Sequence, residues 1–250
     1  MTDSSNAAPP AKLPGPLGRL QRIVAERVNP KAYLGIHLVA GLIVFALGVG
    51  VFSGLLEGVL DNDMLVKWDV AADAWIHARV TTQGLRIFNW ITQVGSPPSM
   101  TALGVIVAVV LWRQRRRIAL IAWSAAFIGG GVFDAVIKQL VHRTRPVYAA
   151  KYLHGHTYSF PSGHSMGSII GIGMLLYLLG IYWHPSRAVR VALIVAAIAI
   201  VILIGVSRLY LGVHFPSDVM GGWAAGAAWA AVCMNGCSFA LHRHESVSSS

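Results

Sequence analysis

Six apolar segments alternate with polar, charged connections along the chain. They cover about residues 34–59, 99–112, 118–137, 164–183, 191–206 and 219–241. A helix needs about 20 mostly apolar residues to cross the hydrocarbon of a bilayer, and most of these segments approach that length. The second segment is short, so we expect it to begin earlier, near Gly95. Because backbone groups in lipid have no water partners, the pattern predicts an all-α polytopic membrane protein, a six transmembrane helix bundle.

Composition agrees with this prediction. The 250 residues are 55% hydrophobic and 12% charged, with a mean hydropathy of +0.61. A soluble domain carries about 25% charged residues, so a disordered chain and a soluble enzyme are both excluded. The net charge of +10 does not indicate nucleic acid, since the basic residues lie in short runs between apolar segments. Cys233 and Cys237 are too few for a disulfide or metal framework.

The polar stretches divide the chain into regions. Residues 1–32 read as a basic, partly flexible cytoplasmic tail, residues 33–241 as the transmembrane domain, and residues 242–250 as a second cytoplasmic tail. Lys and Arg are more numerous on the side that carries both termini than on the opposite side. By the positive-inside rule, the side with more of them is the cytoplasm. We expect the loops at 138–163 and 207–218 to be catalytic and to share the opposite, extracytoplasmic face, because they follow the third and fifth spans.

The longest connection, residues 61–98, is expected on that same extracytoplasmic side. It contains Asp61, Asp63, Asp69 and Asp73 together with Trp68, Trp75 and Trp90. Tryptophans at irregular helical spacing favour an amphipathic segment anchored among the lipid headgroups. A part in a lid or a lipid access path is the alternative, and the sequence does not decide between them.

Three cations gather at the two catalytic loops. Lys138 ends the third span, Arg145 follows seven residues later, and Arg208 ends the fifth span. Ionisable groups at membrane depth are costly and usually functional. Any one of them could be a snorkelling residue at a helix end. Together they would repel one another unless an anion lay between them, and arginine pairs well with phosphate.

Two further features indicate phosphate chemistry. Ser162 and Gly163 precede the fourth span, where a serine cap and the free N–H groups of a helix start bind anions. Pro216 suits a first helical turn, which brings Asp218 one turn from His214. A carboxylate on one imidazole nitrogen fixes the tautomer and leaves the other nitrogen as a nucleophile. Each feature is common by itself, and the prediction depends on the set.

In this order the features resemble the type 2 phosphatidic acid phosphatase superfamily. Its three-part signature is K-x6-RP, PSGH and SR-x5-H-x3-D. The matching residues here are Lys138…Arg145-Pro146, Pro161-Ser162-Gly163-His164 and Ser207-Arg208…His214…Asp218. At an average usage of about 5% per residue type, the third block alone arises by chance in roughly one chain in a thousand of this length. No signature position departs from the pattern.

The resemblance implies a role for each signature residue. His214 would attack phosphorus and form a phosphohistidine, and Asp218 would orient it. His164 would protonate the leaving oxygen and then activate water. The phosphoryl oxygens would be bound by Lys138, Arg145, Ser162, Gly163 and Arg208. No metal and no cofactor are expected, because a cationic pocket repels Mg²⁺.

Other polar residues of the first loop lie outside the signature. His142, Arg143 and Lys151 are candidates for contacts with a headgroup or a second phosphate, as are His154 and His156. The alternative is that they are solvated loop residues. Asp134, one turn before Lys138, is a candidate either to pair with it or to steer it, and a structural role is favoured over catalysis.

The leading hypothesis is an integral-membrane lipid phosphatase. Its candidate substrates are undecaprenyl diphosphate, phosphatidylglycerol phosphate, phosphatidic acid and the phosphates of lipid A. Undecaprenyl diphosphate is favoured only by the family's bacterial distribution, which also suggests a bacterial inner membrane. Apart from substrate and membrane lipid, no nucleic acid or obligate protein partner is expected. Two alternatives stay open, a lipid phosphotransferase using the same phosphohistidine and a non-catalytic lipid or anion transporter.

Overall fold

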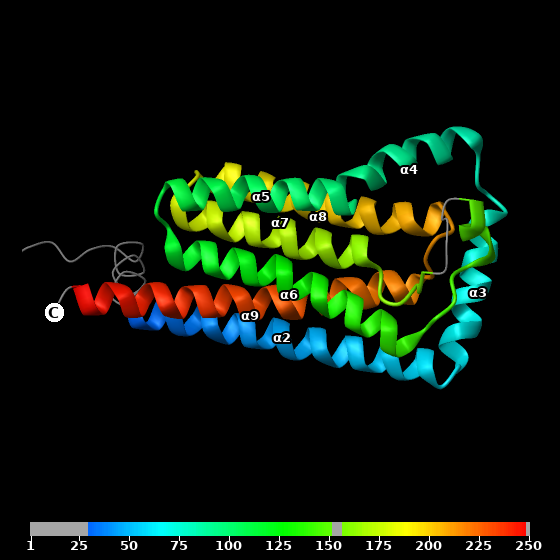
Figure 1. Ribbon diagram of the computed structural model, residues 1–250, viewed down its shortest axis with the longest axis horizontal. Helices are drawn as coiled ribbons and strands as arrows, with labels where there is room; N and C mark the ends of the chain where they lie inside the picture. The colour runs from blue at the N-terminus through cyan, green and yellow to red at the C-terminus, as the bar shows by residue number, and fades with distance from the viewer. Residues whose placement is uncertain (1–29, 152–156, 249–250) are drawn as a thin grey trace, which may run out of the picture.

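The computed structural model describes residues 30–151 and 157–248, and every element in these ranges is helical. Residues 1–29 of the predicted N-terminal tail therefore lie outside the described part. The elements are α2 (Pro30–Leu60), α3 (Met64–His77), α4 (Thr82–Val94), α5 (Pro97–Arg113), α6 (Arg117–Val141), the short 3₁₀ helix η1 (Val147–Lys151), α7 (Gly163–Tyr182), α8 (Arg187–Tyr210) and α9 (Pro216–Ser248). Figure 1 shows the long helices aligned as one bundle.

Six stretches are long and apolar enough to cross a membrane, as the pattern of apolar segments predicts. They are Leu38–Leu60, Thr82–Arg113, Arg117–Val141, Gly163–Tyr182, Arg187–Tyr210 and Pro216–His244. The second combines α4 and α5, which meet at Gly95 and Ser96. Ser96 caps α5 by accepting a hydrogen bond from the Ser99 amide, and Pro97 follows at the first helical position. The chain is thus an all-α membrane protein with six spans.

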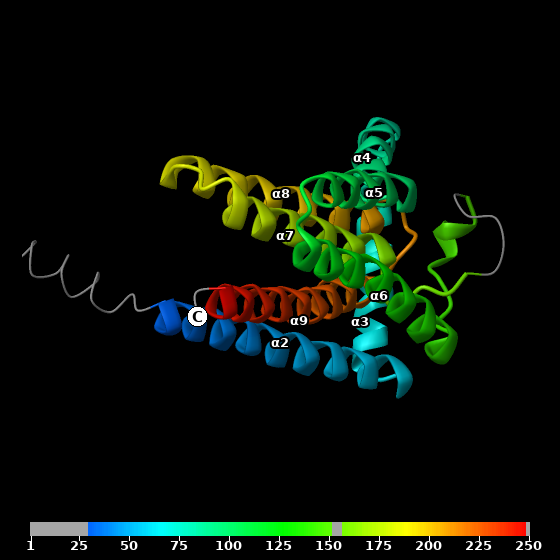
Figure 2. The same cartoon turned by 60° about the vertical axis from the view of Figure 1, so that its left-hand side comes forward.

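Hydrogen bonds and small residues join the spans where backbones approach closely. Helix α9 lies beside α2 and α7 along the bundle (Figures 1 and 2). The hydroxyl of Tyr177 in α7 donates to the Met234 carbonyl in α9 at 3.1 Å, and the indole N–H of Trp123 in α6 donates to the Gly104 carbonyl in α5 at 2.8 Å. Small residues and interhelical hydrogen bonds stabilise helix pairs in lipid, where apolar burial gives little driving force.

Helix α3 crosses the end of the bundle at a steep angle to the spans (Figures 1 and 2). Its amphipathic character agrees with the prediction for the first part of the 61–98 connection, but the polar side faces inward. The expectation is wrong for residues 82–98, which belong to the second span. Asp69 and Asp73 are buried, whereas Trp68 and Trp75 are 69% and 61% exposed. The described ends of the chain, at α2 and α9, lie at the opposite end of the bundle (Figure 1). The described ends of α2 and α9 are therefore remote from α3.

The contact between α7 and α9 generates a prediction about stability. A methyl group on Gly226 of α9 would lie 2.8 Å from the backbone carbonyl oxygen of Met166, whereas one on Gly236 of the same helix would have no neighbour within 4 Å. Overpacking a close contact costs about 1–3 kcal/mol. We expect Gly226→Ala to lower the thermal midpoint in detergent by several degrees and Gly236→Ala to leave it unchanged or higher.

The midpoint can be followed with a thiol-reactive dye, because Cys233 and Cys237 are free and buried. Equal midpoints for the two variants would show that the α7–α9 contact is loose enough to accept a side chain.

Candidate active site

The three signature segments converge at the end of the bundle that α3 crosses. Lys138 Nζ donates to the Pro161 carbonyl at 2.7 Å, which joins α6 to the start of α7. Arg145 donates to the Val213 carbonyl at 2.7 Å, which joins the first loop to the second. The Ser162 amide completes the set by donating to the Asp218 carbonyl at 2.9 Å. Residues up to 80 positions apart therefore form one site, as the order of the spans predicts.

His214 lies at the centre of this site. Its side chain is buried, with Nδ1 3.4 Å from Asp218 Oδ2 and Nε2 3.1 Å from a terminal nitrogen of Arg145. Helix α9 begins at Pro216, which puts Asp218 in its first turn as expected. Asp218 Oδ2 also accepts from the Phe215 amide at 2.9 Å. The carboxylate thus faces one imidazole nitrogen, and the other nitrogen points toward the cations.

This environment keeps the imidazole neutral. Burial, followed by the charges of Arg145, Arg208 and Lys138, lowers the pKa of His214 well below its ordinary value. Only a neutral imidazole has a lone pair for attack, so the site holds His214 in the form a nucleophile needs.

Each of the three cations has a different partner. Lys138 forms an ion pair with Asp134. Arg145 donates through Nε to the carbonyl and hydroxyl of Thr157 at 3.1 and 3.0 Å. Burial lowers the pKa of Arg145, while the nearby carboxylates of Asp218 and Asp134 oppose that shift. These contacts fix the direction of the Lys138 ammonium and the Arg145 guanidinium, and both charges act on His214.

Arg208 is the most deeply buried of the three, at 7% exposure. One terminal nitrogen donates to the hydroxyl of Thr92 in α4 at 2.7 Å. For its Nε, no hydrogen-bond partner is found among residues 30–151 and 157–248. A buried guanidinium with an unused donor can accept an anion, because a charge-assisted hydrogen bond would offset its desolvation.

The start of α7 provides the other side of the site. Ser162 is fully buried and caps the helix by accepting from the Ser165 amide at 3.5 Å, so the predicted cap is confirmed. Gly163 is the first helical residue, and a methyl group there would lie 3.1 Å from Asp134. His164 is partly buried and lies within electrostatic reach of His214 and the cationic cluster. The two histidines therefore flank one cationic space.

Arg143 does not occupy the position expected for a headgroup contact. Its side chain is 8% exposed and its guanidinium bonds to Asp69, Ser217 and Asp218. A buried cation between two carboxylates has its donors engaged inside the protein, so the headgroup hypothesis is wrong for this residue.

The other loop residues predicted to contact a headgroup either lie nearer the surface or are outside the described residues. His142 is exposed, with its ring edge against Tyr158 at 4.5 Å between centroids. The side chain of Lys151 and the whole of His154 and His156 lie outside the described residues. The proposal of a headgroup contact therefore stays open for His142 and Lys151.

Asp69 and Thr92 contact the site although sequence reasoning did not assign them to it. Asp69 on α3 is bonded to Arg143 and Ser217, and Thr92 on α4 is bonded to Arg208. The one available signal was the spacing of Asp69 and Asp73, which share a helix face opposite Trp68 and Trp75. That spacing shows an inward polar face, but it does not show what lies beneath it.

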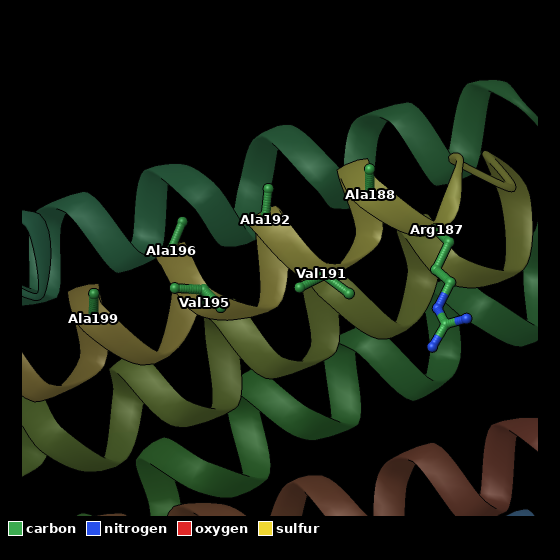
Figure 3. Close-up of a pocket in the computed structure, with 7 residues that line it drawn as sticks. All are labelled: Arg187, Ala188, Val191, Ala192, Val195, Ala196 and Ala199. Carbon is green, nitrogen blue, oxygen red and sulfur yellow. The ribbon is translucent and has the colours of Figure 1, made fainter.

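An apolar groove lies elsewhere in the described part of the chain. It has a volume of about 890 Å³ and runs along the first half of α8, from Arg187 to Ala199, lined by alanines and valines (Figure 3). Arg208 and the signature residues are at the other end of this helix. The groove is therefore an apolar surface within the membrane-spanning region and is separate from the polar site.

The similarity to known proteins includes the three signature segments. Residues 119–240 match the PAP2 superfamily. Phosphatidylglycerophosphatase B of Bacillus subtilis is 32% identical over 142 residues, which cover 56% of this chain and 68% of that protein. Decaprenylphosphoryl-5-phosphoribose phosphatase of Mycobacterium tuberculosis is 35% identical over 133 residues, covering 52% of this chain and 67% of the relative.

A solved structure is similar along most of its length. The crystal structure of the first transmembrane PAP2 type phosphatidylglycerolphosphate phosphatase from Bacillus subtilis superposes with a TM-score of 0.65 at 25% identity. The similarity covers 75% of this chain and 94% of that one.

The bond from Arg208 to Thr92 generates a prediction about anion binding. Thr92→Val keeps the shape of the side chain but removes the hydroxyl, so the guanidinium loses the partner that fixes its direction. A hydrogen bond to a charged group contributes about 1.5–3 kcal/mol, and we expect inorganic phosphate to bind about 10- to 100-fold more weakly. Thr82→Val, at an exposed position on the same helix, serves as the control. Equal phosphate affinities, measured by titration calorimetry, would contradict this role.

Proposed function

The chain belongs to the PAP2 superfamily, and from that premise we propose that it is an integral-membrane phosphatase that hydrolyses a lipid phosphate or diphosphate through a phosphohistidine. The observation that carries this proposal is the position of His214. One ring nitrogen faces Asp218 and the other faces the guanidinium of Arg145 inside a buried, positively charged space.

The first step is phosphoryl transfer to the enzyme. Lys138, Arg145 and Arg208 hold the phosphoryl oxygens with the N-terminal end of α7 and stabilise the charge of the transition state. His214 Nε2 attacks phosphorus while the bond from phosphorus to the leaving oxygen breaks. A bound phosphoryl dianion offsets the charge of the neighbouring cations and so favours protonation of His164. Protonated His164 then gives its proton to that oxygen, so the lipid leaves as an alcohol or, from a diphosphate, as a monophosphate.

The second step releases phosphate. His164, now neutral, takes a proton from a water molecule, whose oxygen attacks phosphorus as the bond to His214 Nε2 breaks. Inorganic phosphate leaves, and His164 is again protonated for the next cycle. Asp218 holds the Nδ1 proton of His214 throughout and stabilises the positive charge that the ring acquires on phosphorylation. The steps need no metal ion, since the three basic side chains supply the positive charge.

The position of the site at the end of the bundle supports a lipid substrate. A lipid can keep its tail in the leaflet while its phosphate reaches the cations at the membrane surface. The curated Bacillus subtilis relative and the solved Bacillus subtilis structure are both named as phosphatidylglycerol phosphate phosphatases. We therefore propose phosphatidylglycerol phosphate and undecaprenyl diphosphate as the first substrates to assay, followed by phosphatidic acid and the lipid A phosphates.

The proposed membrane orientation puts the active site outside the cytoplasm of a bacterial inner membrane. Both described ends of the chain lie away from the site (Figure 1), which supports placing both termini in the cytoplasm. A reporter enzyme fused to the C-terminus tests this orientation, and activity of a reporter that functions only after export would overturn it.

Alanine substitutions of the two histidines should have different effects on the kinetics. His214→Ala should reduce phosphate release from a lipid phosphate by at least about 10³-fold, because no covalent intermediate can form. His164→Ala should be slow by about 10²- to 10⁴-fold, since a general acid–base group contributes that much. With p-nitrophenyl phosphate, whose leaving group needs little protonation, His164→Ala should accumulate an acid-labile phosphoenzyme that His214→Ala lacks.

His184→Ala is the control, because this histidine is exposed between α7 and α8, at the end of the bundle away from the site. Wild-type turnover should persist in excess EDTA and fall with vanadate. Turnover by His214→Ala, or loss of activity on chelation, would contradict the mechanism. Formation of a phosphorylated lipid acceptor in place of free phosphate would identify a phosphotransferase, and ligand flux without turnover would identify a transporter.

A further inference from the structure

The carboxylate of Asp69 reaches the catalytic segment from a helix outside the signature. Asp69 is 2% exposed on the inner face of α3. Its Oδ1 accepts from the backbone amide of Ser217 at 3.0 Å, and its Oδ2 accepts from the Ser217 hydroxyl. Ser217 immediately precedes Asp218 in the first turn of α9. The contact therefore holds the backbone that carries the carboxylate facing His214.

A second connection runs through Arg143. One terminal nitrogen of its guanidinium donates to Asp69 Oδ2 at 2.6 Å, and the other donates to Asp218 Oδ1 at 2.6 Å and to the Ser217 hydroxyl at 2.7 Å. The guanidinium also lies over the ring of Phe215, 4.5 Å from its centroid. Its planar fork thus bridges two carboxylates in a way that a point-charged ammonium group could not.

This arrangement constrains both oxygens of Asp218. Oδ1 accepts from Arg143, and Oδ2 accepts from the Phe215 amide while facing His214 Nδ1 at 3.4 Å. Without Asp69, Arg143 would pair with Asp218 alone and could draw that carboxylate away from the imidazole. With Asp69 present, the guanidinium is held from its far side and shares its charge between two anions. The direction of Asp218 therefore depends on α3.

We propose that Asp69 is a positioning residue for the phosphoryl-transfer reaction, acting through Arg143 and Ser217 to hold Asp218 in the orientation that His214 requires. This inference rests on the proposed function and extends it. Helix α3 then has a part in catalysis, beyond its position at the membrane interface.

The chain offers a matched control on the same helix. Asp73 lies one turn from Asp69 and is also buried, at 6% exposure. Its carboxylate is paired with His77 Nδ1 at 3.3 Å, and that histidine stacks on Tyr148 of η1. Burial raises the pKa of Asp73. Asp73→Asn therefore removes a buried carboxylate from α3 without touching Arg143, Ser217 or Asp218.

The test uses full-length protein in lipid nanodiscs under single-turnover conditions, with enzyme in excess over a labelled lipid phosphate. At saturation this rate constant is independent of the fraction of enzyme that is folded. We expect Asp69→Asn to lower it by about 10- to 100-fold, the range for removing a charge-assisted hydrogen bond. The affinity for inorganic phosphate should stay within about threefold of wild type, since Lys138, Arg145 and Arg208 are unchanged.

Two further variants keep the test decisive if Asp69→Asn folds poorly. Ser217→Ala removes one contact of Asp69 and should lower the rate constant by about 3- to 10-fold. Arg143→Lys keeps the charge but cannot bridge both carboxylates, and it should resemble Asp69→Asn. In the double variant Asp69→Asn/Arg143→Lys, the rate should fall by less than the product of the two single effects, because both substitutions break the same connection.

The outcomes separate the two levels of the proposal. If wild type releases no phosphate, the proposed function fails and this inference fails with it. If wild type is active and Asp69→Asn matches Asp73→Asn within about twofold, the positioning role alone is overturned. A fall in rate accompanied by an equal loss of phosphate affinity would also overturn it, because that would indicate a general collapse of the site.

Discussion

The structure depends on the repulsion among three basic side chains at the mouth of a membrane bundle. All three side chains are partly or fully buried: Lys138, Arg145 and Arg208. An unpaired charge is costly in such a buried position. Among the described residues, Lys138 alone of the three has a carboxylate in direct contact, through Asp134. Arg145 and Arg208 instead donate to carbonyl and hydroxyl oxygens, which satisfy donors without neutralising charge. A phosphate dianion between them would relieve this repulsion. The uncompensated positive charge of the site therefore favours the binding of phosphoryl groups.

The same charges determine the state of the nucleophile. A buried imidazole beside cations loses its proton readily, which keeps His214 neutral before substrate arrives. In the proposed mechanism, the ring becomes positive when it is phosphorylated and then needs the carboxylate of Asp218 on its other side. The geometry therefore serves two stages of the reaction with opposite electrostatic demands, one at each ring nitrogen.

The region before the family match contributes to this site in a way that its composition does not suggest. The PAP2 match begins at residue 119, whereas Asp69 and Thr92 lie on α3 and α4. Each holds a group of the signature region, Asp69 through Arg143 and Thr92 through Arg208. The apolar groove (Figure 3) runs along the first half of α8, whereas Arg208 lies in the last turn of that helix. Support for the catalytic centre thus comes from the segment that crosses the bundle end.

The features that the sequence alone determined are those set by short-range spacing. Apolar run length predicts the six spans, a serine before a helix predicts the cap at Ser162, and a four-residue step predicts that Asp218 faces His214. Parity of the spans places the two loops on one face. The contacts of Asp69, Arg143 and Thr92 were decided only by tertiary structure, since their partners are 74 to 148 residues away. The positions of α3 and α4 against the bundle select these contacts, and those positions depend on packing against several helices at once, which no local pattern records.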